Sequence, residues 1–271
     1  MKTIAHISDL HFGREDPVVA EGLRVDLHRL QPDIVVNTGD FTQRGRRGQF
    51  RAAAAYMRRL PQPQISVPRN HDIPLFDVIQ RFLSPLGRFR RYITPGLFPR
   101  YVDEELSVLG INTARSLTWK SGRISADQIE ELERVLSAFP ASMFKVIVSH
   151  HPFIPPSGEA MAGVDLVGRA TRAVEVIERC GVDLLLAGHL HHGYTGDIRT
   201  FYPSTQRSII VAQAGTAISH RMHREPNGYN FIRLERDCIE VAVRRWREGA
   251  FIEISCVVFR LEDDQWLPQT S

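Results

Sequence analysis

The sequence predicts an α/β fold with mixed β-sheets, and two patterns along the chain carry that prediction. In the first two-thirds, short apolar segments typical of strands alternate with segments whose apolar residues recur at helical spacing. From Ser208 onward, strand-like segments follow one another with short connections, which are typical of antiparallel neighbours. We therefore expect βαβ units first and antiparallel strands afterwards, with helices on the outside.

The expected elements can be placed in order from the spacing of apolar residues and from capping signals. Before residue 74, the alternating part contains a strand at residues 4–7, a helix over 19–30, a strand at 34–36, a helix over 53–60 and a strand at 65–67. After residue 101, it contains a helix opened by a capping box at Ser125 and Gln128, a strand at 146–148, a helix ended by Gly181 and a strand at 182–186. The later part contains strands at 209–211, 231–234, 239–243 and 254–259.

Residues 74–101 interrupt this alternation. The segment is rich in arginine and aromatic residues, namely Arg81, Arg88, Arg90, Arg91, Arg100, Phe82, Phe89, Tyr92, Phe98 and Tyr101. We interpret it as a small helical cap, inserted at about residues 74–104 of a single domain that spans residues 1–271. A chain of 271 residues is long enough for one large α/β domain with such a cap.

Composition narrows the class of protein. The formal net charge of +3 and the pI near 8.9 suit an anionic substrate, but they are too weak to argue for nucleic acid. The N-terminus runs directly into a strand-like segment without a signal peptide, and no stretch reaches the ~18 apolar residues of a membrane span. We therefore expect a cytoplasmic protein without membrane contact. Its oligomeric state stays open, a homodimer included.

Polar residues of similar chemistry follow five of the expected strands. They are Asp9 and His11, Gly39 and Asp40, Asn70 with His71 and Asp72, His150 and His151, and Gly188 with His189 and His191. Because ligands of open α/β sheets bind at the carboxyl ends of strands, we expect these side chains to meet at one rim. Each motif alone has an ordinary structural interpretation, such as a loop aspartate or a surface histidine. Their joint occurrence, each after a strand, favours a functional site.

This set of side chains suits metal ions. Carboxylates, imidazoles and an amide carbonyl bind Mn, Fe, Co or Zn, and the absence of a nearby cysteine in the sequence argues against a structural zinc site. The spacing in Asp9-x-His11 and in His189-x-His191 lets both side chains of a pair leave an extended segment on the same side. A carboxylate such as Asp40 can bridge two cations, and two metals ~3.5–4 Å apart can hold a hydroxide and neutralise phosphate oxygens.

The ordered motifs resemble those of the calcineurin-like metallophosphoesterases, and the resemblance covers residues 4–191. It implies a two-sheet αββα sandwich with helices outside, and a site for two metal ions among Mn, Fe, Zn and Co. The roles that it implies are Asp9, His11 and His191 on one metal, Asn70, His150 and His189 on the other, and Asp40 as the bridge. It further implies that His71 contacts the phosphate and helps protonate the leaving oxygen, and that Asp72 orients His71.

Within the family, residues 70–75, 215–216 and 227–230 are similar to the bacterial branch of cyclic-nucleotide and glycerophosphodiester phosphodiesterases. The resemblance therefore implies a promiscuous hydrolase of small phosphodiesters that uses a metal-bridging hydroxide. A phosphomonoesterase, a nuclease and a non-catalytic scaffold stay open as alternatives. Asp77, Asp103 and Glu104 interrupt the arginines of the cap and so disfavour a nucleic-acid groove, and the presence of all the expected ligands disfavours the scaffold.

One residue departs from the family pattern. Arg69 stands where the family has glycine before the Asn-His-Asp unit, and glycine there indicates a positive φ or a close backbone approach. A left-handed arginine would cost on the order of 1–2 kcal/mol. The sequence leaves several outcomes open for Arg69: a different turn, a strained turn with its side chain in solvent and Asn70 slightly misplaced, or an added cation that contacts the substrate phosphate.

Overall fold

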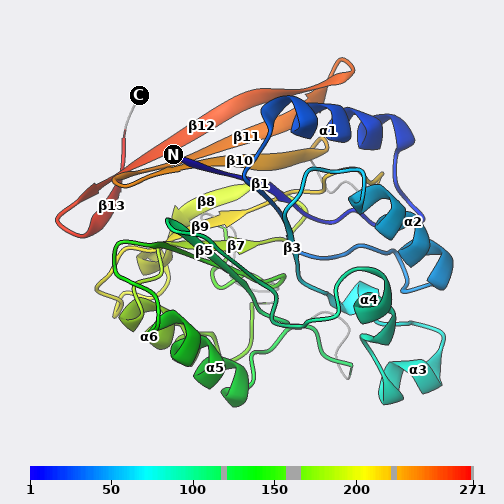
Figure 1. The fold of residues 1–271 in the computed structure, drawn as a ribbon, viewed down its shortest axis with the longest axis horizontal. Helices are drawn as coiled ribbons and strands as arrows, with labels where there is room; N and C mark the ends of the chain where they lie inside the picture. Colours follow the sequence, from blue (N-terminus) through cyan, green and yellow to red (C-terminus); the bar gives the residue numbers. More distant parts are fainter. Residues whose placement is uncertain (117–120, 157–165, 221–224, 270–271) are drawn as a thin grey trace.

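Two mixed sheets lie face to face between layers of helices in the computed structural model, which describes residues 1–116, 121–156, 166–220 and 225–269 (Figure 1). The spatial order in the first sheet is β13 (Gln265–Pro268), β12 (Ala250–Glu262), β11 (Cys238–Arg247), β10 (Gly228–Glu235), β1 (Lys2–Ile7), β2 (Ile34–Asn37) and β3 (Gln64–Ser66). The order in the second sheet is β4 (Arg100–Val102), β5 (Leu106–Gly110), β6 (Phe144–Val148), β7 (Leu184–Ala187), β9 (Ile210–Gln213) and β8 (Tyr194–Asp197). The predicted two-sheet α/β architecture is confirmed.

Parallel strands carry the residues that lead into the site. Strands β1, β2 and β3 are parallel neighbours in the first sheet, as are β5, β6, β7 and β9 in the second. Apolar side chains from both sheets, including Ile4, Val36, Val146 and Leu184, are buried together between them. Because these strands are covered on both faces, most of their sequences are apolar runs, which is why all of them except β5 were predicted.

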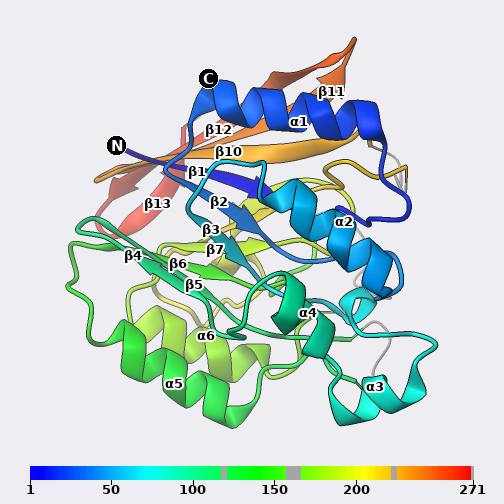
Figure 2. The ribbon, with the colours of Figure 1, turned by 45° about the vertical axis from the view of Figure 1, so that its right-hand side comes forward.

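Helices cover the outer faces of both sheets (Figure 2). They are α1 (Pro17–Leu30) and α2 (Arg47–Met57) on the first sheet, and α5 (Ala126–Leu136) and α6 (Ala170–Arg179) on the second. The predicted capping box opens α5, since Oγ of Ser125 accepts from the N–H of Gln128 at 3.2 Å and Oε1 of Gln128 accepts from the N–H of Ser125 at 2.9 Å. Among the helices of the described residues, none has the length and apolar character needed to cross a membrane.

The segment expected to be a cap is helical only in part. It contains the short helices α3 (Val78–Leu83) and α4 (Gly87–Tyr92), but its last residues form β4, which pairs antiparallel with β5 at the edge of the second sheet. A 3-10 turn, η1 (Asn70–Asp72), precedes the cap, and a second such turn, η2 (Ile198–Thr200), follows β8. The cap thus lies between η1 and a strand of the second sheet.

The expectation that every strand after Ser208 is antiparallel to its neighbours is wrong for β9. Strand β9 is parallel to β7 and pairs antiparallel only with β8. The chain reaches this position because it first forms β8 at the edge of the sheet and then returns between β8 and β7. Strand β8 is half-buried and has no apolar run, so periodicity did not predict it. The strands β4, β5 and β13 were not predicted either.

Candidate metal centre

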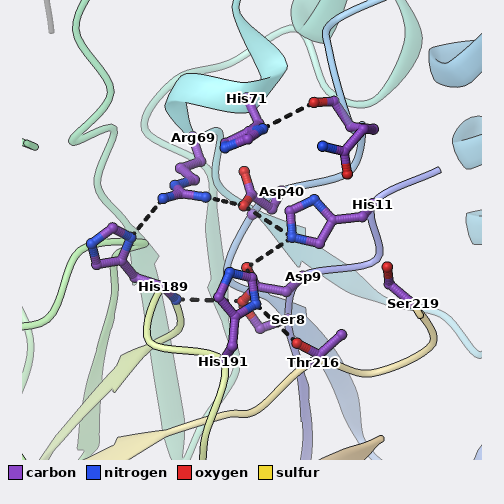
Figure 3. A network of polar contacts seen from close by, with 12 residues as sticks. Ser8, Asp9, His11, Asp40, Arg69, His71, His189, His191, Thr216 and Ser219 are labelled. Carbon is purple, nitrogen blue, oxygen red and sulfur yellow. Dashed lines mark hydrogen bonds and ion pairs between the residues drawn. The ribbon is translucent and has the colours of Figure 1, made fainter. Parts of the chain in front are cut away.

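Predicted site residues from the turns after β1, β2, β3 and β7 lie together in Figure 3, which labels Asp9, His11, Asp40, His71, His189 and His191. The turns after β1, β2 and β3 come from the first sheet, and the turns after β6 and β7 come from the second. The N–H of Asp9 donates to the carbonyl of Gly39 at 3.0 Å, and the N–H of Gly188 donates to the carbonyl of His150 at 3.1 Å. Backbone hydrogen bonds therefore fix the turns to one another in pairs within each sheet.

Left-handed backbone conformations concentrate in these turns. Of the ten described non-glycine residues with positive φ, five lie in these turns: Asp9 (55°), His11 (48°), Asp40 (57°), His189 (79°) and His191 (60°). Such a conformation costs an L-residue roughly 1–2 kcal/mol, so the surrounding structure must hold each one in place. Strain of this kind gathers at functional sites. Sequence reasoning missed this feature, although Asp and His are enriched among non-glycine residues with positive φ.

The Asp9 half-site, formed by Asp9, His11 and His191, has donor spacings that fit a metal ion. Nε2 of His11 lies 3.4 Å from Oδ1 of Asp9 and 3.4 Å from Oδ2 of Asp40. Nδ1 of His191 lies 3.5 Å from Oδ1 of Asp9. Two donors bound at ~2.1 Å to one tetrahedral ion lie about 3.4 Å apart. The same three side chains form a candidate metal-ligating group within the described residues.

Two residues of the Asp9 half-site keep donors prepared for a cation, while Nδ1 of the third, His191, lies 2.9 Å from Oγ1 of Thr216. Oδ1 of Asp9 and both ring nitrogens of His11 are buried, and none of them has a hydrogen-bond partner in the described part of the chain. Burial lowers the pKa of His191 to about 4, so its ring is neutral. Burial alone would raise the pKa of Asp9, but His191 and His11 outweigh it and hold that pKa well below its usual range. Ionised carboxylates and neutral imidazoles are the forms that bind metals, so these residues fit the implied ion.

The Asn70 half-site, formed by Asn70, His150 and His189, has donors that are mostly engaged. Oδ1 of Asn70 accepts from the N–H of Arg115 at 3.1 Å, and its Nδ2 donates to the carbonyl of Ser121 at 3.3 Å. Nδ1 of His150 donates to the carbonyl of Thr38 at 2.5 Å, which leaves Nε2 with a lone pair and without a hydrogen-bond partner in the described residues. The three predicted ligands therefore lie close to the site but are not equivalent.

Arg69 reaches into the centre of the site. Its φ of −131° and ψ of 176° are extended, so the left-handed turn considered for this position does not occur. The side chain is buried and does not point to solvent. Its Nη1 donates to Oδ2 of Asp40, and its Nη2 donates to Nδ1 of His189 at 2.8 Å (Figure 3). Arg69 is thus an added cation, and in the structure it contacts predicted metal ligands.

His71 and Asp72 have separate partners in η1. Nδ1 of His71 donates to the carbonyl of Gln43 at 2.9 Å, so Gln43, which sequence reasoning missed, orients the ring. The carboxylate of Asp72, expected to orient His71, accepts instead from the backbone N–H of Thr42 at 3.0 Å and of Arg69 at 3.2 Å. Burial first, and then the charge of Asp40, raise the pKa of Asp72 to about 8. The observed bonds of Asp72 fix the turn that carries Arg69.

A cavity of about 190 Å³ opens beside His71. It is lined by Gln43, Arg44, Asn70, His71, Ile73, Leu75 and Arg81. The cavity joins the end of the metal centre to the first residues of the cap. Its arginines give it a positive character that suits a phosphate group.

Comparison with known proteins places the sequence in a family. Residues 2–193 match the family model described as calcineurin-like phosphoesterase. A protein of Arcobacter nitrofigilis described as a probable glycerophosphodiester phosphodiesterase is 24% identical over 203 residues, which cover 69% of this chain and 71% of that protein. A probable cyclic nucleotide phosphodiesterase of Synechococcus sp. is 21% identical over 245 residues, which cover 87% of this chain and 88% of that protein. Both names agree with the branch that the motifs resemble.

Solved structures share the fold. A purple acid phosphatase from yellow lupin superimposes with a TM-score of 0.67 at 13% identity, over 96% of this chain and 53% of the lupin chain. This chain therefore spans about half of the lupin protein. Vacuolar protein sorting 29 from Cryptosporidium parvum superimposes with a TM-score of 0.51 at 12% identity, over 96% of this chain and 98% of that one. At such identities these matches support the two-sheet fold alone.

Proposed function

Because the chain belongs to the calcineurin-like phosphoesterase family, we propose that it hydrolyses small phosphodiesters, such as cyclic nucleotides or glycerophosphodiesters, with a bound metal. The observation that carries the proposal is the Asp9 half-site, in which Oδ1 of Asp9 and both ring nitrogens of His11 are buried without a hydrogen-bond partner within the described residues. Two relatives described as probable phosphodiesterases support a diester as the substrate. The partner of this protein is then a small molecule.

In this proposal, the Asp9 half-site and Asp40 hold an ion of Mn, Fe, Zn or Co. When bound, such an ion supplies positive charge to a phosphate oxygen and activates a water molecule. A second ion, which the family resemblance implies at the Asn70 half-site, meets an obstacle in Arg69.

His71 is the proposed proton carrier of the reaction. Its ring lies 5.6 Å from the ring of His11, measured between centroids, and it also lines the cavity. Because Nδ1 donates its hydrogen to Gln43, the other nitrogen, Nε2, is the atom that would meet the phosphate and the leaving oxygen, and it would carry a proton to donate when the ring is in its doubly protonated imidazolium form. Asp72 supports this arrangement indirectly, by holding the turn that contains His71.

A phosphomonoesterase is the second candidate, and the positive lining of the cavity favours it. Arg44 and Arg81 both line the cavity, and neither belongs to the predicted metal ligands. A monoester carries about two negative charges and a diester about one, so additional cations favour the monoester more strongly. Arg81 already donates to the carbonyl of Pro74 at 3.4 Å, which leaves Arg44 as the stronger argument.

The two candidates are separated by rates on matched substrates. The protein would be loaded separately with Mn, Co, Zn and Fe and assayed with an aryl phosphodiester and with the corresponding aryl phosphomonoester. We expect faster hydrolysis of the diester with at least one metal. Faster hydrolysis of the monoester would reassign the protein as a phosphatase. A metal-loaded protein that cleaves neither substrate would contradict the proposed function.

A further inference from the structure

The guanidinium of Arg69 lies where two predicted ligands of the second metal converge (Figure 3). It donates to Oδ2 of Asp40 through Nη1 and to Nδ1 of His189 through Nη2. By resemblance, Asp40 would bridge both ions and His189 would bind the second. An ion shared by these two side chains would sit ~2.0–2.2 Å from each donor atom, and the guanidinium occupies the space between them.

The hydrogen bond from Arg69 holds His189 in a form that cannot bind a metal. A guanidinium only donates hydrogen bonds, so Nδ1 of His189 must be the acceptor and must lack a hydrogen. The single hydrogen of the neutral ring is then on Nε2. One nitrogen is used by arginine and the other is protonated. No lone pair of this imidazole is left for an ion.

The other donors do not rebuild the second position. The amide of Asn70 is bonded at both ends by backbone groups, and its Oδ1 has given one of its two lone pairs to the N–H of Arg115. Nε2 of His150 keeps its lone pair, but His150 forms a candidate metal-ligating group only together with Asp9 and Asp40. Within the described residues, every candidate group contains Asp9 and none contains His189. The candidate ligand groups formed by His, Asp, Glu or Cys side chains therefore gather around Asp9.

The positive charge of Arg69 also opposes the binding of a second metal ion. Arg69 is 5% exposed and pairs with Asp40, whose side chain is fully buried. Two like charges a few ångströms apart repel strongly in a protein interior, so an ion would have to displace the guanidinium. The backbone of Arg69 is held as well, since its N–H donates to Oδ2 of Asp72 at 3.2 Å.

We propose that Arg69 is a built-in second cation, so that the chain binds one metal ion at the Asp9 half-site and the guanidinium takes the place of the second. This proposal rests on the proposed function, because it concerns the same site. Asp40 then joins the ion to the guanidinium instead of bridging two ions. Nε of Arg69 is buried and has no hydrogen-bond partner in the described residues.

The test is the number of metal ions bound by the wild type and by Arg69→Gly. Each protein would be loaded with Mn²⁺, freed of excess metal by gel filtration and measured by elemental analysis. We expect about one ion per chain in the wild type and about two in Arg69→Gly, which has the family glycine and frees Asp40 and His189. Electron paramagnetic resonance should show an isolated Mn²⁺ in the wild type and a magnetically coupled pair in the variant.

Two further variants test whether a change in the number of bound metal ions is specific to Arg69. Arg44→Gly removes the same charge and side chain from the edge of the cavity without touching a predicted ligand, so it should bind as many ions as the wild type. Adding His189→Ala to Arg69→Gly should return the count to that of the wild type, because His189 becomes a ligand only when Arg69 is absent.

The possible outcomes separate this inference from the proposed function. A wild type with two ions per chain would overturn the inference and leave the hydrolase intact. A wild type with one ion and an Arg69→Gly protein that also binds one would show that Arg69 is not what excludes the second ion. A wild type with no ion would overturn the proposed function itself. If Arg69→Gly fails to fold, the wild-type count and its resonance spectrum still decide the inference.

Discussion

The two halves of the metal centre contain similar side chains but offer different chemistry. In the Asp9 half-site, Oδ1 of Asp9 and the ring nitrogens of His11 are buried, with no hydrogen-bond partner among the described residues. In the Asn70 half-site, the backbone engages both ends of the Asn70 amide, and Arg69 bonds His189. This difference in hydrogen bonding shows that residue type alone does not define a metal site. A donor binds an ion only if the protein has left its lone pair free.

The largest expected effect comes from Asp40→Ala, which damages both halves at once. The change removes a carboxylate from the ion and leaves Arg69 as a buried charge without its counter-charge. Breaking a buried pair in this way costs about 3–5 kcal/mol in the free energy of unfolding. Loss of the ion's contribution should lower kcat/KM by about 10³-fold or more, since ~4 kcal/mol corresponds to three factors of ten. Urea unfolding and steady-state kinetics measure the two effects.

A double variant separates the two causes. In Asp40→Ala combined with Arg69→Gly, no unpaired charge is left behind, so most of the lost stability should return while activity stays low. If Asp40→Ala alone is as stable as the wild type, the buried pair between Asp40 and Arg69 does not exist in solution.

The next effect tests the inequality of the half-sites directly, by comparing His11→Ala with His189→Ala. The ring nitrogens of His11 have no hydrogen-bond partner in the described residues, so removal of this side chain should abolish tight metal binding. His189 bonds Arg69, so His189→Ala should retain the ion and lose about 1–3 kcal/mol of stability from the unsatisfied guanidinium. Calorimetric titration with Mn²⁺ measures both affinities. Equal losses of affinity would restore a two-metal assignment.

The location of the site could be predicted from the sequence, because the motifs follow buried parallel strands whose carboxyl ends have a known relation to ligands. The state of each donor could not. It depends on contacts distant in the sequence, such as Arg69 with His189 and His150 with the carbonyl of Thr38. The same limit applies to β8. Its half-buried residues do not alternate between apolar and polar, and the strand forms only because it pairs at the edge of the second sheet.

The conformation at residue 69 illustrates the limit of local reasoning. The family glycine suggested a positive φ at this position, and the structure has an extended arginine instead. The tight approach occurs at Gly39, where φ is +105° and an added Cβ would meet the carbonyl oxygen of Val67 at 3.1 Å and Cβ of Arg69 at 3.3 Å. Glycine is therefore required at position 39, in the neighbouring turn after β2, against which Arg69 packs.

A smaller effect is expected for His71→Ala, which should leave both halves of the metal centre unchanged. His71 bonds Gln43 and is not a predicted metal ligand, so the metal content should stay the same. General acid help is worth roughly 10²–10⁴-fold, so a diester with an alkoxide leaving group should react slower by that factor. A diester with a nitrophenolate leaving group needs no proton and should lose much less. Equal losses on both substrates would mean that His71 binds the phosphate without donating a proton.

The smallest effect concerns a hydroxyl that supports only the Asp9 half-site. Oγ of Ser8 is buried and donates to Oδ2 of Asp9 at 2.6 Å, which leaves Oδ1 directed to His11 and His191. Loss of such a partner typically weakens metal affinity by about 10–100-fold, so Ser8→Ala should bind Mn²⁺ more weakly by that factor.

The matched control for Ser8→Ala is Thr113→Val, which removes a buried hydroxyl that lies 2.7 Å from Nδ1 of His151, a histidine outside the predicted ligand set. Both changes remove one buried hydroxyl at the same end of the sandwich, so a general loosening of the fold would affect both variants alike. If the ion sits at the Asp9 half-site, only Ser8→Ala should change the affinity measured by calorimetric titration. If both variants lose affinity equally, the ion is sensitive to the His150–His151 turn as well, and the single position assigned beside Asp9 is wrong.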